Sequence, residues 1–338
     1  MKKILVVCAA ILTLHSWPLL AQEADDAGST GVEFSIIPRL DLSMVPHSRD
    51  WDFALGNSSL YTLFEGNITE NLSFSVANHW MSFYDTDDLR DDTKALYNKT
   101  FWHSDTNNWL DWAYLEYTTG DWIFTLGKNT MLTGGYEYDA YDWDLHSSLG
   151  SSFWNNFQCY QWGGRVGYAL TEDHVLSLEL TTSPYGERPF SSGLFAASVG
   201  WRGSIGPWQP LWSFSAIQRD DDEIEPVFYF GNRFELEPVA VELDLSNRVG
   251  DELLILDKGF AAHCRADWSI SDHFSLLGKV GYEDHSTPGV DNWNLGAAFH
   301  WFPLKESQDL RVHATVAYDT LPELATLTVG VLYNLKLF

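Results

Sequence analysis

The chain has 338 residues and a formal net charge of −27, with 47 acidic residues against 20 basic ones. Such an excess of negative charge argues against DNA, RNA or an anionic lipid surface as a charge-matched partner. Aromatic residues make up 15% of the chain and include 16 tryptophans, and tryptophan is an amphipathic residue that favours the membrane interface.

The N-terminal residues have the pattern of an export signal. Residues 1–21 combine Lys2 and Lys3 with an apolar run that ends at Ala21, before an acidic stretch. This order is typical of a secretory signal peptide that is cleaved after a small residue. We therefore expect export through a cleaved signal, followed by a short N-terminal lead at 22–31 and by the folded domain.

Few cysteines remain after cleavage. Cys8 lies in the signal, so only Cys159 and Cys264 belong to the mature chain. This number excludes a disulfide scaffold. A bridge between the two cysteines and a pair of free thiols both stay open, and free thiols are favoured.

Beyond residue 31, apolar and polar residues alternate in short segments. Between 258 and 268, for example, Phe260, Ala262 and Trp268 alternate with His263 and Arg265. This period of two is typical of strands with one apolar and one polar face. Past the signal no apolar stretch approaches the roughly 18 to 20 residues that a spanning helix requires. If the chain spans a membrane, it must therefore do so as a closed barrel.

The alternating pattern predicts about sixteen antiparallel strands, most of them near the 9 to 11 residues that a tilted membrane strand needs. Short connections alternate with long ones, as they do in outer-membrane barrels, and a soluble β-sandwich has no reason to alternate in this way. Residues 32–338 are thus expected to form one all-β domain, a transmembrane antiparallel β-barrel. The strands are expected at 32–44, 58–68, 71–84, 109–119, 121–131, 158–170, 174–184, 193–205, 208–219, 226–236, 239–250, 258–268, 273–284, 291–302, 309–320 and 324–338.

Aromatic residues on the apolar face gather at the strand ends. Trp122, Trp201 and Trp268 fall at the short-turn end of their strands, while Tyr160 and Trp293 fall at the opposite end. Any all-β protein buries some alternating aromatics. The position of aromatic residues at both ends of many strands indicates instead the two aromatic girdles of a membrane barrel.

In architecture the mature chain resembles the general porins of Gram-negative outer membranes. More locally, Gly127-Lys128 followed by GGYEYDA (134–140), and the run NNFQCYQ (155–161), are similar to the porin O and P family, often labelled phosphate-selective. The resemblance implies an outer-membrane channel for passive diffusion of small hydrophilic solutes, which is usually a homotrimer in contact with outer-membrane lipid. The acidic segment 134–144 lacks the basic cluster that phosphate selection requires, so cations or neutral sugars and phosphate or other anions both stay open as solutes.

Residues 132–157 form the third long connection, and the resemblance implies that this outer loop folds into the lumen and narrows the pore. Its stretch GGYEYDAYDWDLHS fits neither a helical nor a strand period. We expect its carboxylates to form a negative rim, because charged rings govern which ions enter a narrow passage, and its aromatic rings to pack against the wall or to offer faces to sugars. A solvated cap over the barrel is the alternative. The expected constriction residues are Tyr136, Glu137, Tyr138, Asp139, Tyr141, Asp142, Trp143 and Asp144.

Cationic residues are expected on the inward face of the strands. Opposite an acidic loop they would create a transverse field that aligns polar solutes. Carboxylates such as Asp41, Glu179 and Glu242 share this face, so local ion pairs that merely satisfy the interior are the alternative. The expected wall residues are Arg39, Arg165, Arg233, Arg265, Lys279 and Arg311.

Two other functions remain as alternatives. An outer-membrane rim enzyme of the lipase or protease type would draw on His146-Ser147, or on His103 with Asp105, although no GxSxG motif accompanies them. A barrel plugged by 132–157 would instead suit a scaffold subunit. The acidic residues between 85 and 92 could bind calcium, but a solvated surface is favoured because the glycine pattern of a calcium hand is missing. We predict a non-enzymatic porin with no cofactor and no metal.

Overall fold

The computed structural model describes residues 31–46, 51–54, 58–82, 110–139, 149–151, 157–186, 190–247, 259–284, 291–321 and 323–337. These residues form antiparallel strands and a single-turn helix. The strands are β1 (Val32–Pro46), β2 (Trp51–Ala54), β3 (Ser59–Thr69), β4 (Leu72–Ser82), β5 (Leu110–Thr119), β6 (Trp122–Thr130), β7 (Tyr160–Thr171), β8 (His174–Thr182), β9 (Phe195–Gly203), β10 (Trp208–Gln218), β11 (Ile224–Glu235), β12 (Val239–Asn247), β13 (Phe260–Ser271), β14 (Phe274–Asp284), β15 (Asp291–Trp301), β16 (Leu310–Asp319), β17 (Leu324–Tyr333) and β18 (Leu335–Lys336).

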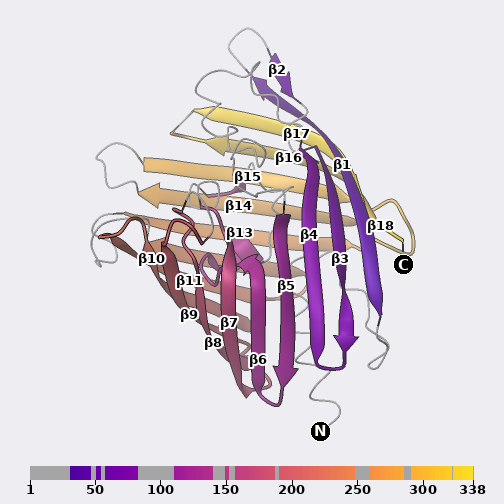
Figure 1. The fold of residues 1–338 in the computed structure, drawn as a ribbon. Coiled ribbons are helices and arrows are strands. Elements are labelled where there is room, and N and C mark those ends of the chain that lie inside the picture. Colours follow the sequence, from indigo (N-terminus) through magenta and orange to yellow (C-terminus); the bar gives the residue numbers. More distant parts are fainter. Residues whose placement is uncertain are drawn as a thin grey trace.

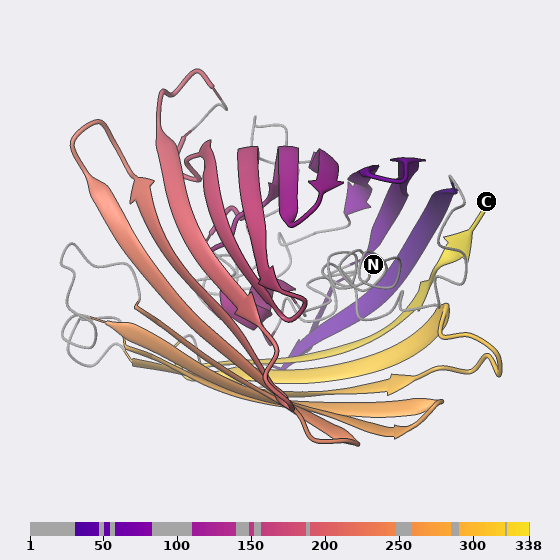
Figure 2. The same ribbon diagram turned by 90° about the horizontal axis from the view of Figure 1, so that it is seen from below.

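Sixteen long strands close into one antiparallel barrel in the described part of the chain (Figure 1). Long strands that follow one another in the chain are neighbours in the sheet, and the ring closes where β1 pairs with β17 on one side and with β3 on the other. The short strands β2 and β18 both add to β1. Figure 2 shows the strands curving around a common interior. The predicted antiparallel barrel of about sixteen strands is therefore confirmed.

Strand positions agree closely with the sequence pattern, because side-chain alternation continues for the length of each strand. One difference lies at the C-terminal end, where the segment expected as 324–338 is interrupted at Asn334 between β17 and β18. The sequence pattern also missed β2, which consists of only four residues, Trp51–Ala54. A four-residue strand is too short to establish a period.

Alternation along each strand separates an inner from an outer face. In β16, Arg311, His313 and Thr315 are buried, while Val316 and Tyr318, which follow them on the alternate positions, are exposed. The same alternation in the other long strands places an apolar surface on the outside of the barrel and most charged side chains on the inside. This is the reverse of a water-soluble protein, whose outer surface is polar.

Aromatic rings on the outer face pair near the strand ends. Trp122 of β6 and Tyr168 of β7 lie at the short-turn end with ring centroids 4.7 Å apart, and Tyr282 and Trp293 lie at the opposite end with centroids 4.9 Å apart. Tyr160 departs from the expected girdle. It packs against a cluster of the inner wall, because it begins β7 directly after the long connection from β6.

The inner wall is not uniformly polar. One apolar cluster covers the inside of β1, β3, β4, β5 and β17, where tilted and edge-to-face aromatic contacts pack it. Contacts of this kind add to the stability that burial of apolar surface provides. Its members are Ile37, Tyr61, Leu63, Ala77, Trp112 and Leu332.

A single-turn helix, α3 (Gly135–Asp139), lies in the connection between β6 and β7. The sequence pattern predicted no helix here, and that expectation is wrong. Five residues make too little of a helix for a 3.6-residue period to appear, and its stability comes from the barrel wall beside it. Among the residues that the structure describes, no helix is long and apolar enough to cross a membrane.

Candidate functional site

The β6–β7 connection, residues 131–159, is bound to the inner wall through its described parts. At its start, the backbone N–H of Leu132 donates to Glu179 Oε2 of β8 at 2.8 Å. The Thr133 hydroxyl lies 2.5 Å from the hydroxyl of Ser215 on β10. Met131 and Phe157, from the two ends of the connection, share an apolar cluster with Tyr229 and other inward side chains of β9, β10 and β11. The loop therefore leaves β6 toward the interior of the barrel.

Helix α3 packs against β10, β11 and β12. The Tyr136 hydroxyl donates to the carbonyl oxygen of Gln209 on β10 at 2.8 Å, and the backbone N–H of Glu137 donates to Asp244 Oδ2 on β12 at 3.0 Å. Gly135 has φ +54° and lies so close to Tyr229 that a Cβ here would be 2.2 Å from Cε1 of that ring. Glycine is therefore required at this position both for its backbone conformation and for space.

The Glu137 side chain makes several polar contacts across the interior. Its carboxylate lies 3.2 Å from Lys279 Nζ of β14, and it accepts hydrogen bonds from the N–H and hydroxyl of Ser151 at 2.6 and 2.5 Å. The Glu137 side chain is 1% exposed and that of Lys279 is 0% exposed. Burial alone would raise the pKa of Glu137, but the Lys279 ammonium and the Ser151 hydrogen bonds outweigh it and hold the pKa below its ordinary value.

Leu149 fixes the far end of the described loop. It is fully buried and packs with Leu277, Ala298 and Ala317 on the inner faces of β14, β15 and β16. Its carbonyl oxygen accepts a hydrogen bond from Lys279 Nζ. Because β6 and β15 are nine places apart in a ring of sixteen long strands, the loop reaches the opposite side of the barrel from the strand that it leaves.

Of the predicted constriction residues, the structure describes the side chains of Tyr136 and Glu137, and both are buried contacts of the loop with the wall. Glu137 was expected on a charged rim, and this is corrected: its charge is compensated inside the protein by Lys279. Tyr138 and Asp139 belong to α3, and their side chains are outside the description. Outside the described residues also lie Tyr141, Asp142, Trp143 and Asp144.

The predicted wall cations lie on the inner face, and most of them form ion pairs there. Lys279 pairs with Glu137 of the loop, whereas Arg39, Arg165, Arg233 and Arg265 pair with carboxylates of the wall itself. Arg311 is 1% exposed within this wall. The described wall thus matches the local ion pairs that were the alternative to a transverse field. The wall pairs are Arg39 with Asp41, Arg165 with Glu179, Arg233 with Glu235 and Glu242, and Arg265 with Asp267 and Glu242.

Leu149, Ser151 and Tyr229 also belong to the site, although the sequence pattern did not predict them. Leu149 carried a weak signal, since it is an aliphatic residue in a polar and aromatic connection. Ser151 and Tyr229 carried none, because a hydroxyl in a loop and an aromatic residue in a strand are common in any barrel. Only their contacts with Glu137 distinguish them.

The residues considered above for catalysis and for calcium binding lie outside the described residues. They are His103, Asp105, His146 and Ser147, and the acidic residues between 85 and 92. Within the described ranges, no group of three or more His, Cys, Asp or Glu side chains could hold a metal ion. Cys159 and Cys264 are both free. Burial raises the pKa of the Cys159 thiol, which keeps it protonated and unreactive.

Neither a protein-family model nor a curated protein sequence matches this chain. Among solved structures, OmpT of Vibrio cholerae, an outer-membrane protein, is 12% identical with a TM-score of 0.57 over 93% of this chain and 99% of that one. A mutant of the Rhodobacter blastica porin is 14% identical with a TM-score of 0.56 over 90% of this chain and 100% of that one. A further porin structure is 12% identical with a TM-score of 0.59 at the same coverage. At these identities the likeness shows the fold, a closed sixteen-stranded barrel.

Proposed function

We propose that this chain is a general porin of a Gram-negative outer membrane, through which small hydrophilic solutes diffuse passively. The observation that carries the proposal is the β6–β7 loop, which is fastened to the inner wall by the Glu137–Lys279 ion pair and by Leu149. The apolar outer face with its aromatic pairs fits a lipid bilayer, and the charged inner face fits a hydrated interior. Both features agree with the fold of the porins described above.

The loop supplies the selective part of such a channel. A loop that crosses the interior reduces the open cross-section, and its attachment through buried contacts keeps the narrowed passage constant in size. Solutes then move down their own gradient, and the barrel supplies only a polar path through the bilayer. No chemical step, cofactor or energy source takes part.

Charge compensation along the wall bears on which solutes pass. Since Arg39, Arg165, Arg233 and Arg265 have carboxylate partners, the wall presents little net charge at these positions. The aspartates of the loop then decide the sign of the field in the passage, and they favour cations and neutral sugars over anions. The phosphate-selective behaviour that the local resemblance implies is the opposite expectation.

The cellular setting forms part of the same proposal. The chain is exported through a signal peptide cleaved near Ala21, and the barrel inserts into the outer membrane, where its partners are lipid and the solutes themselves. A homotrimer, the usual assembly of porins, is proposed as the oligomeric state.

Single-channel recording in a planar bilayer tests the function directly. The purified barrel is placed under a salt gradient, and phosphate is then added as a competitor. Stepwise currents with a cation-leaning reversal potential support a porin whose acidic loop sets the selectivity. Anion-leaning currents that phosphate blocks would instead support the phosphate-selective alternative. An absence of current steps from folded protein contradicts the porin and supports a plugged barrel or a rim enzyme.

A further inference from the structure

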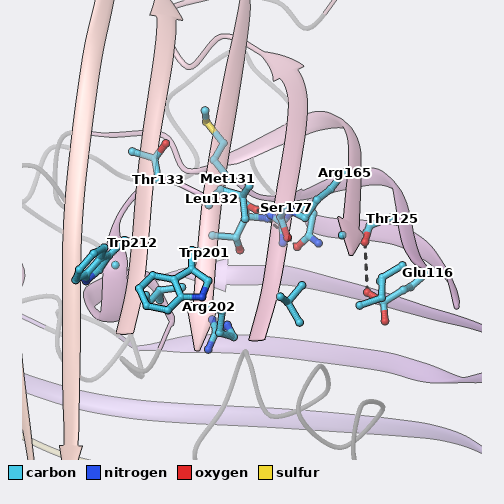
Figure 3. A pocket seen from close by; sticks show the side chains of 18 of the residues that line it. Glu116, Thr125, Met131, Leu132, Thr133, Arg165, Ser177, Trp201, Arg202 and Trp212 are labelled. Atoms are coloured by element: carbon cyan, nitrogen blue, oxygen red, sulfur yellow. Dashed lines mark hydrogen bonds between the residues drawn. The ribbon is translucent and has the colours of Figure 1, made fainter. Parts of the chain in front are cut away.

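Hollows lie on both faces of the wall that includes β7 to β10. The inner hollow, of about 140 Å³, is bordered by Leu132 of the β6–β7 loop and belongs to the channel (Figure 3). The outer hollow is a groove of about 460 Å³ on the face that points away from the lumen. Glu179 and Ser198 border this groove from the inner face, to which their side chains point. The groove is therefore apolar on the side that an occupant would contact.

The shape of the outer groove follows from the sizes of its side chains. Leu178 and Leu180 of β8 stand on one side, 66% and 59% exposed, and Phe214 of β10 stands on the other. Between them, Ala197 of β9 and Ala216 of β10 are paired across the two strands and form the floor. A groove with protruding walls accepts a thin, flexible occupant better than it accepts the broad wall of another barrel.

The groove lies at the depth of the hydrocarbon core. In β9, Ala197 and Val199 lie between Phe195 and Trp201. Trp201 belongs to the aromatic girdle at the short-turn end, where it packs edge-to-face against Trp212 with ring centroids 5.1 Å apart. Such rings favour the membrane interface. The strand rises roughly 13 Å between Trp201 and Ala197 and is tilted, so the groove lies within the leaflet on the side of the short turns, whose hydrocarbon is about 15 Å thick.

The size of the groove fits one acyl chain. Ten residues line it, whereas about 20–30 residues on each side form a stable interface between two proteins. A cavity of about 150 Å³ accommodates benzene, so at the same scale the groove has room for roughly 18 carbon atoms. The groove is also continuous with the apolar outer face of the barrel, which faces the bilayer. A lipid chain therefore fits it better than a second copy of this protein.

The turns beside the groove indicate the head group of the lipid. Asp121 lies in the short turn after β5, and Glu172 and Asp173 lie in the short turn after β7. The turns 120–121, 172–173 and 204–207 are all described, and none of them contains a lysine or an arginine. An anionic head group on this side of the membrane would meet carboxylates, whereas a head group with an ammonium would be attracted to them.

From these observations we infer that the outer groove between Leu180 and Phe214 binds one acyl chain of a zwitterionic phospholipid, whose ammonium-bearing head group lies beside the short turns. The inference deepens the proposed function, because it names the lipid that is the partner of the barrel. It rests on the proposed function for the location in a membrane, and it does not require that the barrel conducts.

Native mass spectrometry of the folded barrel tests the groove. The barrel is released from detergent micelles that contain dipalmitoyl phosphatidylethanolamine or dipalmitoyl phosphatidylglycerol, which have the same chains and a zwitterionic or an anionic head group. We expect roughly threefold greater retention of the first lipid, because the acidic turns repel the second. Equal retention of the two lipids would overturn the inference.

A short-chain lipid separates the acyl chain from the head group. Dihexanoyl phosphatidylethanolamine has the same head group, but its chains are too short to reach Ala197 from the girdle. Its retention should be roughly tenfold lower than that of the dipalmitoyl lipid, because its chains leave the groove unfilled. Equal retention would show that the head group alone is bound and would overturn the inference.

Variants locate the retained lipid. A197F and A216F each place a ring on the floor of the groove and should reduce retention by roughly tenfold. A297F is the matched control, since Ala297 of β15 also faces outward, between the exposed Leu295 and Phe299, and lies outside the groove. Unchanged retention in A197F and A216F, each with a native circular dichroism spectrum, would refute the site. An assembly of lipid-free barrels that A197F and A216F dissociate would mean that a second copy occupies the groove, and would refute the site as well.

Failure of this inference is distinguishable from failure of the proposed function. Current steps in a bilayer, together with lipid retention that A197F and A216F do not change, would refute the groove and leave the porin standing. Lipid retention that both variants reduce, in a barrel that passes no current, would refute the porin and leave the groove standing.

Discussion

At the scale of single residues, the Glu137–Lys279 ion pair has the largest consequence. Both side chains are inaccessible to water, and the carboxylate is further bound by Ser151. Removing the partner of a buried charge destabilises a protein far more than removing the partner of a surface charge, because no water replaces the lost contact. The ion pair therefore holds the loop against β14. Removing the ion pair tests whether the loop narrows the channel.

Replacing Lys279 with methionine should release the loop. Loss of one partner from a buried ion pair costs about 3–5 kcal/mol, which is comparable with what the two hydrogen bonds from Ser151 contribute, and the hydrogen bond from Lys279 to the Leu149 carbonyl oxygen is lost as well. We expect a larger and noisier single-channel conductance from K279M. K305M, which removes a lysine from the exposed connection between β15 and β16, is the control and should conduct like the native protein. Identical conductance of K279M and K305M would show that the fastening is not needed.

The pH dependence of loop attachment follows from the pKa of Glu137. Burial opposes ionisation, but Lys279 and Ser151 hold the pKa below its ordinary value of 4.5. A carboxyl group whose pKa is lowered by folding stabilises the folded form above the ordinary pKa and loses this effect as the pH falls through the lowered one. The native loop should therefore stay attached at pH 4.5 and loosen only in stronger acid.

In K279M the pH dependence should reverse. With the ammonium group gone, burial raises the pKa of Glu137 in the attached loop above its ordinary value, so the released loop is favoured at neutral pH and protonation of Glu137 favours attachment in acid. The conductance of K279M should therefore fall toward the native value as the pH is lowered. A conductance of K279M that instead rises in acid would contradict this account.

At the scale of elements, α3 shows how the barrel wall determines the structure of a short segment. Five residues cannot form a stable helix alone. Here Tyr136 and the Glu137 backbone are bound by β10 and β12, and Gly135 brings the chain against Tyr229. The sixteen long strands differ in this respect, because the sequence itself contains their alternation of apolar and polar residues, and each of them was predicted at nearly its observed position.

Substitution of Gly135 by alanine should displace α3. The new Cβ would lie 2.2 Å from the Tyr229 ring, in a backbone conformation with φ +54° that disfavours side chains. We expect a lower conductance, because the helix moves away from the wall and into the passage. G120A separates the effect of the backbone conformation from that of the clash. Gly120 in the β5–β6 turn has φ +58°, and a Cβ added there would have no neighbouring atom within 4 Å. G120A should cost about 1 kcal/mol in stability and leave the conductance unchanged, and an effect of the same size in both variants would argue against the clash.

At the scale of the whole molecule, selectivity depends on how charge is distributed over the interior. The described wall compensates most of its cations locally, which leaves the loop aspartates as the source of the proposed cation preference. This differs from the sequence-based expectation of a basic wall facing an acidic loop. Alternation identifies which residues face inward, but it contains no information on which neighbours will pair across strands.

Replacement of Asp139, Asp142 and Asp144 by asparagine should reduce the cation preference. The change removes three negative charges while conserving side-chain size, so the conductance in symmetric salt should change little and the reversal potential in a salt gradient should shift toward zero. Asp220, Asp221 and Asp222 of the exposed β10–β11 turn offer a matched triple control with the same change in charge. Equal shifts in both triple variants would mean that the overall charge, and not the loop, sets the selectivity.

The sequence by itself determined the barrel: the number of long strands, their order, the apolar outer face and the inward position of cations such as Arg165 and Lys279. These properties follow from a period of two along each strand and from alternating connection lengths. Both are local patterns and can therefore be recognised in the sequence. The site was decided by the tertiary structure. Glu137 meets Lys279 across 142 positions of sequence, and Leu149 meets Ala317 across the interior, because closure of the sheet brings β14 to β16 opposite β6. Contacts between segments so far apart depend on the closed ring, and no local pattern encodes them.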